Sequence, residues 1–339
     1  MLKVAKFGGT SVADSLQIEK IKSIVEADDD RRYIVVSAPG KRFEKDSKVT
    51  DLFYLFKNNL DANLPSDQIW GIIRDRFIAE EIALGNSGII GKELDIIKQK
   101  IEDGETTDYI VSRGEYLNAV LIAKYLGFDF VDAKDLIVLS DSGRPDIKAS
   151  IENLKKELKS HERAVIPGFY GTDKNGKIKT FSRGGSDITG ALVAAAVDAD
   201  IYENWTDVSG FLMADPRIIE NPKKISKITY KELRELSYMG AKVLHEEAIF
   251  PAKQANIPIN IRNTNDPADG GTLITSDVDD TKEEYIIKGI AGSKDFTDIT
   301  IYKEGLSTER GFVRKLAEIM EDFDITLEHI PNGIDTISA

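Results

Sequence analysis

The sequence predicts an α/β fold with a mostly parallel sheet whose two faces are covered by helices. Strand-like and helix-like segments alternate along the first half of the chain. Two strand-like segments, 33–37 and 163–169, are dominated by apolar residues, as expected for strands that are buried on both faces. Ligands of such sheets bind outside the carboxyl ends of the strands, so residues that directly follow strands are the first candidates for a site.

Hydrophobic periodicity predicts the individual elements of this sheet and its helices. The clearest is a long helix over 107–126, where Val111, Leu117 and Leu121 recur at helical spacing. In chain order, the pattern predicts strands at 2–7, 33–37, 128–131, 137–139 and 163–169, and helices at 14–27, 49–60, 66–85, 92–103, 107–126 and 146–160.

The pattern changes near residue 289, where a second domain is expected. A strand at 298–302, a helix at 309–322 and strands at 326–330 and 334–338 form a β-α-β-β unit. This unit lacks the second helix and the closing strand of a split βαβ domain. We therefore expect a first, large domain over 1–288 and an incomplete second domain over 289–339.

Composition excludes several classes of function. The 339 residues include no cysteine, so disulfides, thiolate zinc sites and a cysteine nucleophile are absent, which fits a reducing cytoplasm. The net charge of −13 disfavours nucleic acid and anionic membranes as partners. The longest apolar run, Ala191–Val197, is too short to span a bilayer, and we expect no secretory leader. The three histidines lack metal-binding spacing, and we predict no metal ligands from the protein.

The first predicted strand leads directly into a glycine turn that suits an anion. Gly8 and Gly9 allow backbone N–H groups to approach a phosphate without an intervening Cβ. Lys6 adds a mobile positive charge, and Thr10 and Ser11 add hydroxyl donors. This combination favours phosphoryl transfer, although a strand that ends in two glycines is often only a tight turn.

A second glycine turn opens onto an apolar helix near residue 185. The turn contains Gly184 and Gly185, and Ser186 is the predicted N-cap of the helix. A buried, capped helix would explain these three residues. Arg183 and Asp187 flank the turn, and a capped helix requires neither of them. An arginine fork fits a carboxylate, so these two residues favour a binding site.

The remaining motifs are ambiguous or negative. Gly114 lies mid-helix between Arg113 and Glu115, where it indicates either close ligand approach or a helix–helix contact. The stretch 171–177 matches part of a P-loop, but Ile178 replaces the metal-binding hydroxyl, so a polar hairpin explains it better. No Gly-x-Gly exists, which excludes a Rossmann fingerprint.

Taken together, these motifs closely resemble aspartokinase, the aspartate kinase of the amino-acid kinase family. The resemblance covers about residues 1–289, and the remainder resembles the start of an ACT regulatory domain with Arg310–Phe312 before its helix. The motifs stand in family order at Lys6–Val12, Arg113–Glu115, Gly168–Asp173, Ser182–Asp187, Trp205–Val208, Asp215–Arg217 and Gly240–His245.

The resemblance implies a fold and a reaction. The fold is a three-layer α/β/α sandwich with a mostly parallel eight-stranded sheet, plus a partial ACT-like unit. The reaction is phosphorylation of the L-aspartate side chain by ATP to 4-phospho-L-aspartate, the first step of lysine, threonine and methionine biosynthesis. Mg²⁺ is expected on the ATP phosphates, lysine or threonine as effector, and a homo-oligomer as the assembly.

The resemblance also implies roles for individual residues. Lys6 holds the transferring phosphoryl group and Asp187 orients it. Arg183 pairs with the α-carboxylate of aspartate and Glu115 with its α-ammonium. The aspartate pocket is completed by Ser37, Thr50 and the backbone at Phe169. The expected nucleotide-binding residues are Lys6, Gly8, Gly9, Ser11, Gly184, Gly185, Ser186, Thr206, Asp207, Leu212, Arg217, Lys242 and Val243.

Three positions depart from the family pattern. Leu212 replaces an aromatic residue near the nucleotide, and the adjacent Phe211 is a candidate substitute. Glu246 replaces a proline, and Gly190 replaces an alanine, which should loosen its helix slightly. None of these changes removes a charged group from the proposed chemistry.

Two alternatives to an aspartate kinase stay open at this point. Glu115 and Arg183 fit the main-chain groups of any amino acid, so a kinase acting on glutamate or another carboxylate is one alternative. A non-catalytic amino-acid sensor that uses the ACT-like segment is the other, and the intact phosphate-site residues oppose it. The incomplete second domain leads us to expect a truncated chain, with weak feedback inhibition if 339 residues are its natural length.

Overall fold

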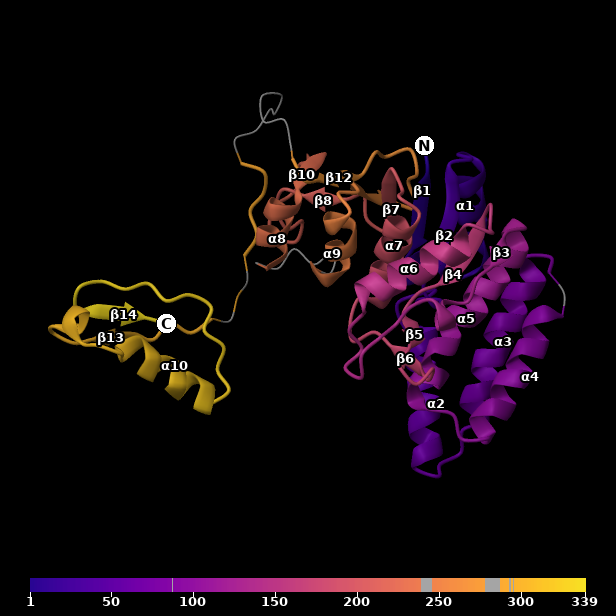
Figure 1. The fold of residues 1–339 in the computed structure, drawn as a ribbon, viewed down its shortest axis with the longest axis horizontal. Coiled ribbons are helices and arrows are strands. Elements are labelled where there is room, and N and C mark those ends of the chain that lie inside the picture. Colours follow the sequence, from indigo (N-terminus) through magenta and orange to yellow (C-terminus); the bar gives the residue numbers. More distant parts are fainter. Residues whose placement is uncertain (87, 239–245, 278–286, 293, 295) are drawn as a thin grey trace. The chain divides into compact units, whose positions relative to one another are not determined.

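The computed structural model describes residues 1–86, 88–238, 246–277, 287–292, 294 and 296–339 (Figure 1). It divides into two compact units, Met1–Ala291 and Gly292–Ala339, called here the first and the second unit. Within the described ranges, no helix combines the length and apolar character that crossing a bilayer requires.

The first unit is built on an eight-stranded sheet in the order β10-β12-β11-β7-β1-β2-β4-β3. All neighbouring strands are parallel except β11 and β12, so the prediction of a mostly parallel eight-stranded sheet is confirmed. The strands are β1 (Lys3–Phe7), β2 (Arg31–Val36), β3 (Asp129–Phe130), β4 (Ala164–Pro167), β7 (Ile201–Thr206), β10 (Lys227–Thr229), β11 (Ile259–Asn263) and β12 (Thr272–Thr275).

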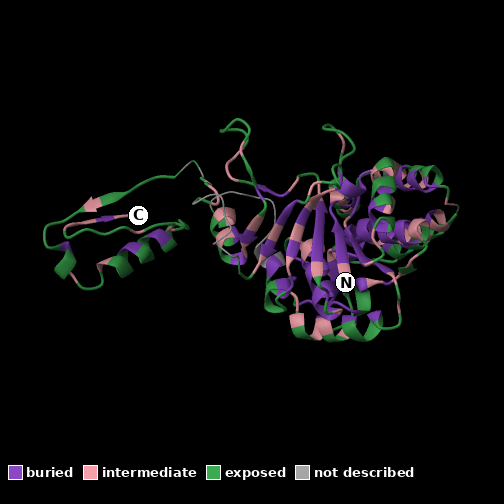
Figure 2. Cartoon of the chain, turned by 90° about the horizontal axis from the view of Figure 1, so that it is seen from above, coloured by how far each residue is buried: buried purple, intermediate pink, exposed green. Residues whose placement is uncertain are grey.

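Helices cover both faces of the sheet. Because successive side chains of a strand point to opposite faces, each strand contacts both helix layers. On β1, Val4 packs with one helix layer and Ala5 with the other. Figure 2 shows the strands of the sheet as mainly buried between these layers. One layer holds α6 (Ile147–Leu158), α7 (Gly185–Ala196), α8 (Tyr230–Tyr238) and α9 (Glu246–Gln254); the other holds α1 (Ser15–Glu26), α2 (Val49–Asp61), α3 (Asp67–Ala83), α4 (Ile89–Glu102) and α5 (Thr107–Leu126).

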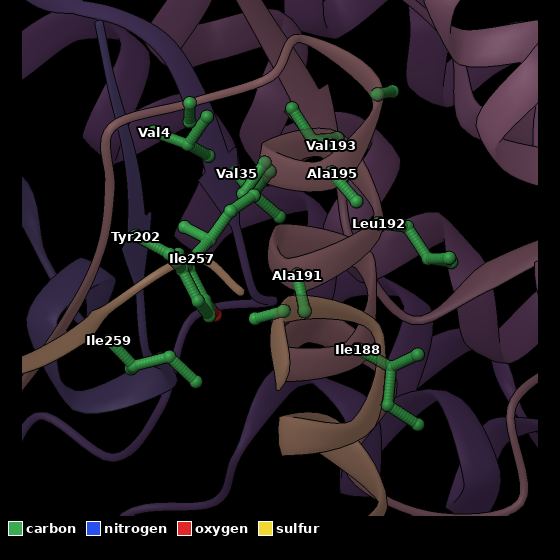
Figure 3. Packing of buried hydrophobic residues seen from close by; sticks show 14 of the residues in the cluster. Val4, Val35, Ile188, Ala191, Leu192, Val193, Ala195, Tyr202, Ile257 and Ile259 are labelled. Carbon is green, nitrogen blue, oxygen red and sulfur yellow. The ribbon is translucent and has the colours of Figure 1, made fainter. Parts of the chain in front are cut away.

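Helix α7 is the centre of one hydrophobic cluster, where it meets β1, β2 and β7 (Figure 3). Its glycine, Gly190, allows the ring of Tyr202 to approach closely. A Cβ at this position would lie 2.5 Å from the Tyr202 hydroxyl. That hydroxyl donates a hydrogen bond to the carbonyl of Asp187 at 3.1 Å. Gly190 therefore makes room for the packed ring of Tyr202. The sequence showed only that glycine replaces the alanine of the family pattern here and did not reveal this contact.

Two short hairpins extend from the first unit. Strands β5 (Tyr170–Thr172) and β6 (Ile178–Thr180) pair antiparallel, which confirms the hairpin prediction for 171–177. Strands β8 (Phe211–Leu212) and β9 (Lys224–Ile225) form the other hairpin. The strand predicted at 137–139 is wrong, because this segment forms only isolated bridges, at Val138 and Leu139. The described part of this unit also contains the 3₁₀ turns η1 (Gly9–Val12) and η2 (Ala133–Asp135).

The second unit is small. It contains β13 (Thr300–Tyr302), η4 (Leu306–Thr308), α10 (Phe312–Asp322) and β14 (Thr336–Ser338), and β13 pairs antiparallel with β14. The strand predicted at 326–330 is wrong. Its apolar residues Leu327 and Ile330 pack against the small core, but their backbone finds no partner strand.

Candidate active site

The carboxyl end of β1 presents a buried lysine. Lys6 is only 7% exposed, and its Nζ lies 2.5 Å from Oδ1 of Asp187. Asp187 stands in the first turn of α7, which packs on the same face of the sheet. Asn204, the neighbour of Lys6 on β7, donates from Nδ2 to the same oxygen at 2.9 Å. The pair thus joins the two glycine turns, as expected if Asp187 orients Lys6.

The glycine turn after β1 is held by other parts of the protein. The N–H of Gly8 donates to the carbonyl of Trp205 at 3.0 Å. The hydroxyl of Ser11 is buried and lies 2.7 Å from that of Thr264. Two of the predicted phosphate donors, the N–H of Gly8 and the hydroxyl of Ser11, therefore have partners within the protein. Gly9 begins η1, a position whose N–H has no acceptor within the helix, so its amide and Lys6 are the donors best placed for an anion.

A second loop presses against this turn. The N–H of Gly40 donates to the carbonyl of Gly9 at 2.8 Å, and a Cβ on Gly40 would lie 2.6 Å from that carbonyl group. Only glycine fits such an approach. The loop after β2 is thereby fixed beside the phosphate turn, and it leads into α2, whose first turn carries Thr50.

Glu115 provides a buried carboxyl group beside this loop. It is 5% exposed, and its Oε2 has no hydrogen-bond partner. Burial raises the pKa of its carboxyl group to about 8, against the opposing hydrogen bond from the backbone of Ala38. Its neighbour Gly114 packs so closely on Ala38 that a Cβ would lie 2.9 Å from the Ala38 side chain. The glycine therefore serves a contact within the protein, and the unpartnered oxygen is suited to a cationic ligand.

Other predicted pocket residues lie at the ends of neighbouring strands. Ser37 follows β2, and its carbonyl accepts a hydrogen bond from Nδ2 of Asn118 at 2.7 Å. Phe169 lies between β4 and β5 with a φ of 75°, a left-handed conformation that costs energy for a residue other than glycine. Its backbone adjoins the start of α7, since a Cβ on Gly185 would lie 2.8 Å from the Phe169 Cα. These residues converge on the edge of the sheet that carries Lys6.

The second glycine turn differs from expectation in its cap. Gly184, with a φ of 57°, is the N-cap of α7, and no side chain caps the helix. The prediction of Ser186 as N-cap is therefore wrong, because the helix begins at Gly185, two residues earlier than that role requires. Arg183 is exposed, and no acid in the described ranges forms an ion pair with it. Its guanidinium is available to a carboxylate.

The predicted nucleotide residues follow β7. Thr206 donates to the carboxylate of the exposed Asp207 at 3.1 Å. Arg217 is exposed and bound to Asp215 at 2.6 Å, which lowers the pKa of that carboxyl to about 2. Leu212 is exposed, whereas Phe211 is buried in the core and cannot offer its ring to a nucleotide. Lys242 and Val243 lie outside the described residues.

Sequence reasoning missed a buried arginine that stabilises the loop beside the phosphate turn. Arg76 of α3 is buried and donates to the carbonyls of Ala13, Gly40 and Ser47 at 2.9, 2.5 and 2.9 Å. It ties α3 to both ends of the loop beside the phosphate turn. Glu80, one helical turn further along, lies 3.5 Å from Arg76 and is also buried. A charged pair at i,i+4 on an otherwise apolar helix face was the available signal. Within the described ranges, no three acidic or histidine side chains form a group that could hold a metal ion.

Comparison with known proteins identifies the family of this site. A model of the amino acid kinase family matches residues 1–263. The chain belongs to this family. Its aspartokinase branch is shown by Aspartokinase 3 of Bacillus subtilis, which is 39% identical over 99% of this chain and 77% of the relative. The lysine-sensitive aspartokinase 3 of Escherichia coli is 30% identical over 96% of this chain and 75% of its own length.

Solved structures of family members agree. The aspartate kinase of Clostridium acetobutylicum has a TM-score of 0.93 and 53% identity over 99% of this chain and 77% of that chain. The E. coli aspartokinase III complex with aspartate and ADP has a TM-score of 0.77 and 26% identity over 100% of this chain and 78% of that chain.

Proposed function

We propose that this chain transfers the γ-phosphoryl group of ATP to the side-chain carboxylate of L-aspartate, giving 4-phospho-L-aspartate and ADP. The observation that carries the proposal is the buried Lys6–Asp187 pair, together with the unpartnered carboxyl oxygen of Glu115, in a chain that is 39% identical to an aspartokinase. The E. coli relative was solved with aspartate and ADP bound, which names the same two substrate classes.

The site needs charge and alignment more than a base. An aspartate side chain has an ordinary pKa near 3.9 and is already an anion at neutral pH, so no residue must remove a proton from it. Lys6 neutralises charge on the transferring phosphoryl group, and Asp187 holds Lys6 in place. Mg²⁺ would arrive bound to the ATP phosphates and lower their negative charge. The positioning role of Asp187 agrees with its contacts, because its Oδ1 already accepts hydrogen bonds from Lys6 and Asn204.

Substrate aspartate would be held by its main-chain groups. Glu115 offers a buried oxygen without a partner to the α-ammonium. Arg183 offers a free guanidinium to the α-carboxylate, in the bidentate geometry that arginine favours. Ser37 and Phe169 close the pocket at the ends of β2 and β4. These groups leave the side-chain carboxylate of aspartate directed at the phosphate turn.

Replacing Lys6 tests the phosphoryl-transfer role. Lys6→Ala should lower kcat by about 10²–10³, the effect of removing one preorganised donor to developing charge. The matched control is Lys3→Ala on the same strand, because Lys3 pairs with Asp28 and is expected to leave kcat unchanged. Near-normal turnover of the Lys6 variant in a coupled ADP-release assay would refute its role.

Replacing Arg183 tests the aspartate pocket. A charged hydrogen bond is worth about 1.5–3 kcal/mol, so Arg183→Ala should raise KM for aspartate by about one to two orders of magnitude. Arg163→Ala is the control, since Arg163 pairs with Asp29. The same assay with glutamate and N-acetylglutamate separates an aspartate kinase from a kinase of another carboxylate. An unchanged KM for aspartate would assign Arg183 to the phosphates or to the fold.

The second unit is proposed as the beginning of an ACT-type regulatory domain through which the chain forms a homo-oligomer. The relative from E. coli is named lysine-sensitive, and a structure of it holds lysine together with aspartate. We propose lysine as the effector of this protein as well, with threonine as the alternative. Inhibition of ADP release by each amino acid over a concentration series tests the choice.

A further inference from the structure

A cavity of about 440 Å³ lies in the first unit, and its lining includes none of the residues proposed for phosphoryl transfer. Its walls come from α4, α5, the segment after β3 and the β5–β6 hairpin. This volume is within the range of small-molecule sites, about 300–1,000 Å³. The cavity therefore has the size of a ligand site but belongs to a different part of the unit.

A buried arginine lines this cavity. Arg113 is 4% exposed, its Nε donates to the carbonyl of Tyr109 at 3.1 Å, and its Nη2 donates to Oγ of Ser112 at 2.9 Å. The rings of Tyr109, Tyr116 and Tyr170 lie 4.4, 4.7 and 5.0 Å from the guanidinium carbon. No acid in the described ranges forms an ion pair with Arg113. A buried cation without an anionic partner is costly, and aromatic faces offset that cost only in part.

The other charged residues of the lining are three lysines and three acids. Lys100, Lys134 and Lys177 line the cavity, and none of them has an ion pair with an acid that the structure describes. Two of the acids in the lining are engaged by tyrosines: Glu93 accepts from the hydroxyl of Tyr116 at 2.9 Å, and Asp132 accepts from that of Tyr170 at 2.6 Å. Glu105 is the remaining acid in the lining. The lining thus carries four cations and three carboxylates, and none of the four cations forms an ion pair with an acid in the described ranges.

We propose that this cavity is a second binding site, separate from the phosphoryl-transfer site, for a small anion that carries a carboxylate or a phosphate. Arg113 binds the oxyanion at the cavity wall, and the three lysines attract it at the exposed parts of the lining. The aromatic rings of the tyrosines pack against the remainder of the ligand. This site stands on contacts that do not involve Lys6, Asp187 or Glu115 and is independent of the proposed function.

Calorimetric titration of the full chain with inorganic phosphate, and separately with succinate, tests this site and distinguishes the two ligand chemistries. Arg113→Gln should weaken binding of the preferred probe by about tenfold or more, as expected for loss of a charged hydrogen bond. Lys177→Gln should weaken it several-fold. Lys174→Gln is the matched control, because this exposed lysine of the same hairpin lies outside the lining and should leave the affinity unchanged.

Binding at the phosphoryl-transfer site is separated by Arg183→Ala, which should keep the affinity for the probe. Loss of binding in that variant together with retention in Arg113→Gln would overturn the proposal. So would the absence of saturable binding to the unmodified chain up to about 10 mM. If circular dichroism shows that Arg113→Gln does not fold, the comparison of Lys177→Gln with Lys174→Gln tests the proposal instead. Equal affinities of these two variants for the probe would overturn the proposal.

Discussion

At the scale of single residues, Glu115 links stability, pH and substrate binding. Its carboxyl has a pKa of about 8 in the folded protein, compared with an ordinary value of 4.5. Between these two values the folded state holds a proton that the unfolded chain has released. Stability should therefore fall as pH rises from 4.5 to 8, with the full cost of ionising this buried group present above pH 8. The α-ammonium of bound aspartate would favour the ionised form, so substrate binding near neutral pH should release a proton.

Glu115→Gln should flatten this dependence. One proton contributes at most about 1.4 kcal/mol per pH unit to the free energy of unfolding. Urea unfolding across the window measures the slope. Glu80 contributes to the same window because burial raises its pKa to about 7, so the slope is reduced and not abolished. Glu102→Gln, at an exposed position of α4, is the control. A Glu115 variant with the original slope would show that this carboxyl does not hold the proton.

At the scale of elements, α3 supports the loop beside the phosphate turn through Arg76. Arg76→Met would remove three hydrogen bonds to backbone carbonyls and leave Glu80 and Asp46 without their buried cation. Breaking a buried ion pair costs about 3–5 kcal/mol. We expect a loss of about 3 kcal/mol in the free energy of unfolding, because Glu80 can take up a proton, and a higher KM for aspartate.

The same helix supplies a matched control for this prediction. Arg74 pairs with Asp95 at 2.7 Å, and both side chains are exposed. Exposed pairs are worth about 0–1 kcal/mol, so Arg74→Met should have a small effect on urea unfolding. Equal losses in the two variants would mean that the buried network around Arg76 does not stabilise the loop.

Element prediction from sequence succeeded where the signal is local. Helix α5 spans 107–126 as its periodicity predicts, and the polar hairpin stands where the P-loop match failed. It failed where a distant partner decides. The apolar stretch 326–330 has a strand-like pattern, but a strand requires a neighbour to pair with, and this segment has none. The N-cap of α7 was misplaced because Gly184 adopts a left-handed conformation.

At the scale of the whole molecule, the two units differ in how much core they bury. Among its described residues, the core of the second unit has four buried apolar side chains, Leu306, Leu316, Met320 and Ile337. A core this small gives little stability by itself. Exposed apolar side chains on and after α10, such as Ile319 and Phe323, are available for association. The outer edge of β13 is available as well, since this strand pairs only with β14 in the described part of the unit. The other edge of β14 is engaged by the segment 331–333, through a bridge between Asn332 and Ile337.

Association through the second unit predicts a concentration-dependent protection of its amides. Hydrogen exchange within 298–339 should slow as protein concentration rises, because association stabilises only the associating unit. Amides of β1 and α7 serve as an internal control and should exchange at a constant rate. Strong protection of the second unit at every concentration, in a chain that sediments as a monomer, would contradict the proposed homo-oligomer.

The sequence by itself determined the parallel α/β sheet, the place of its glycine turns and the types of charged residue near them, because periodicity and turn chemistry are local properties. Only the tertiary structure decided which of those groups are free to act. Gly8 and Ser11 are engaged by residues more than 190 positions away, whereas Lys6 meets Asp187 and an oxygen of Glu115 stays unpartnered. The partner of a hydrogen bond depends on how distant segments pack, and no local pattern encodes that arrangement.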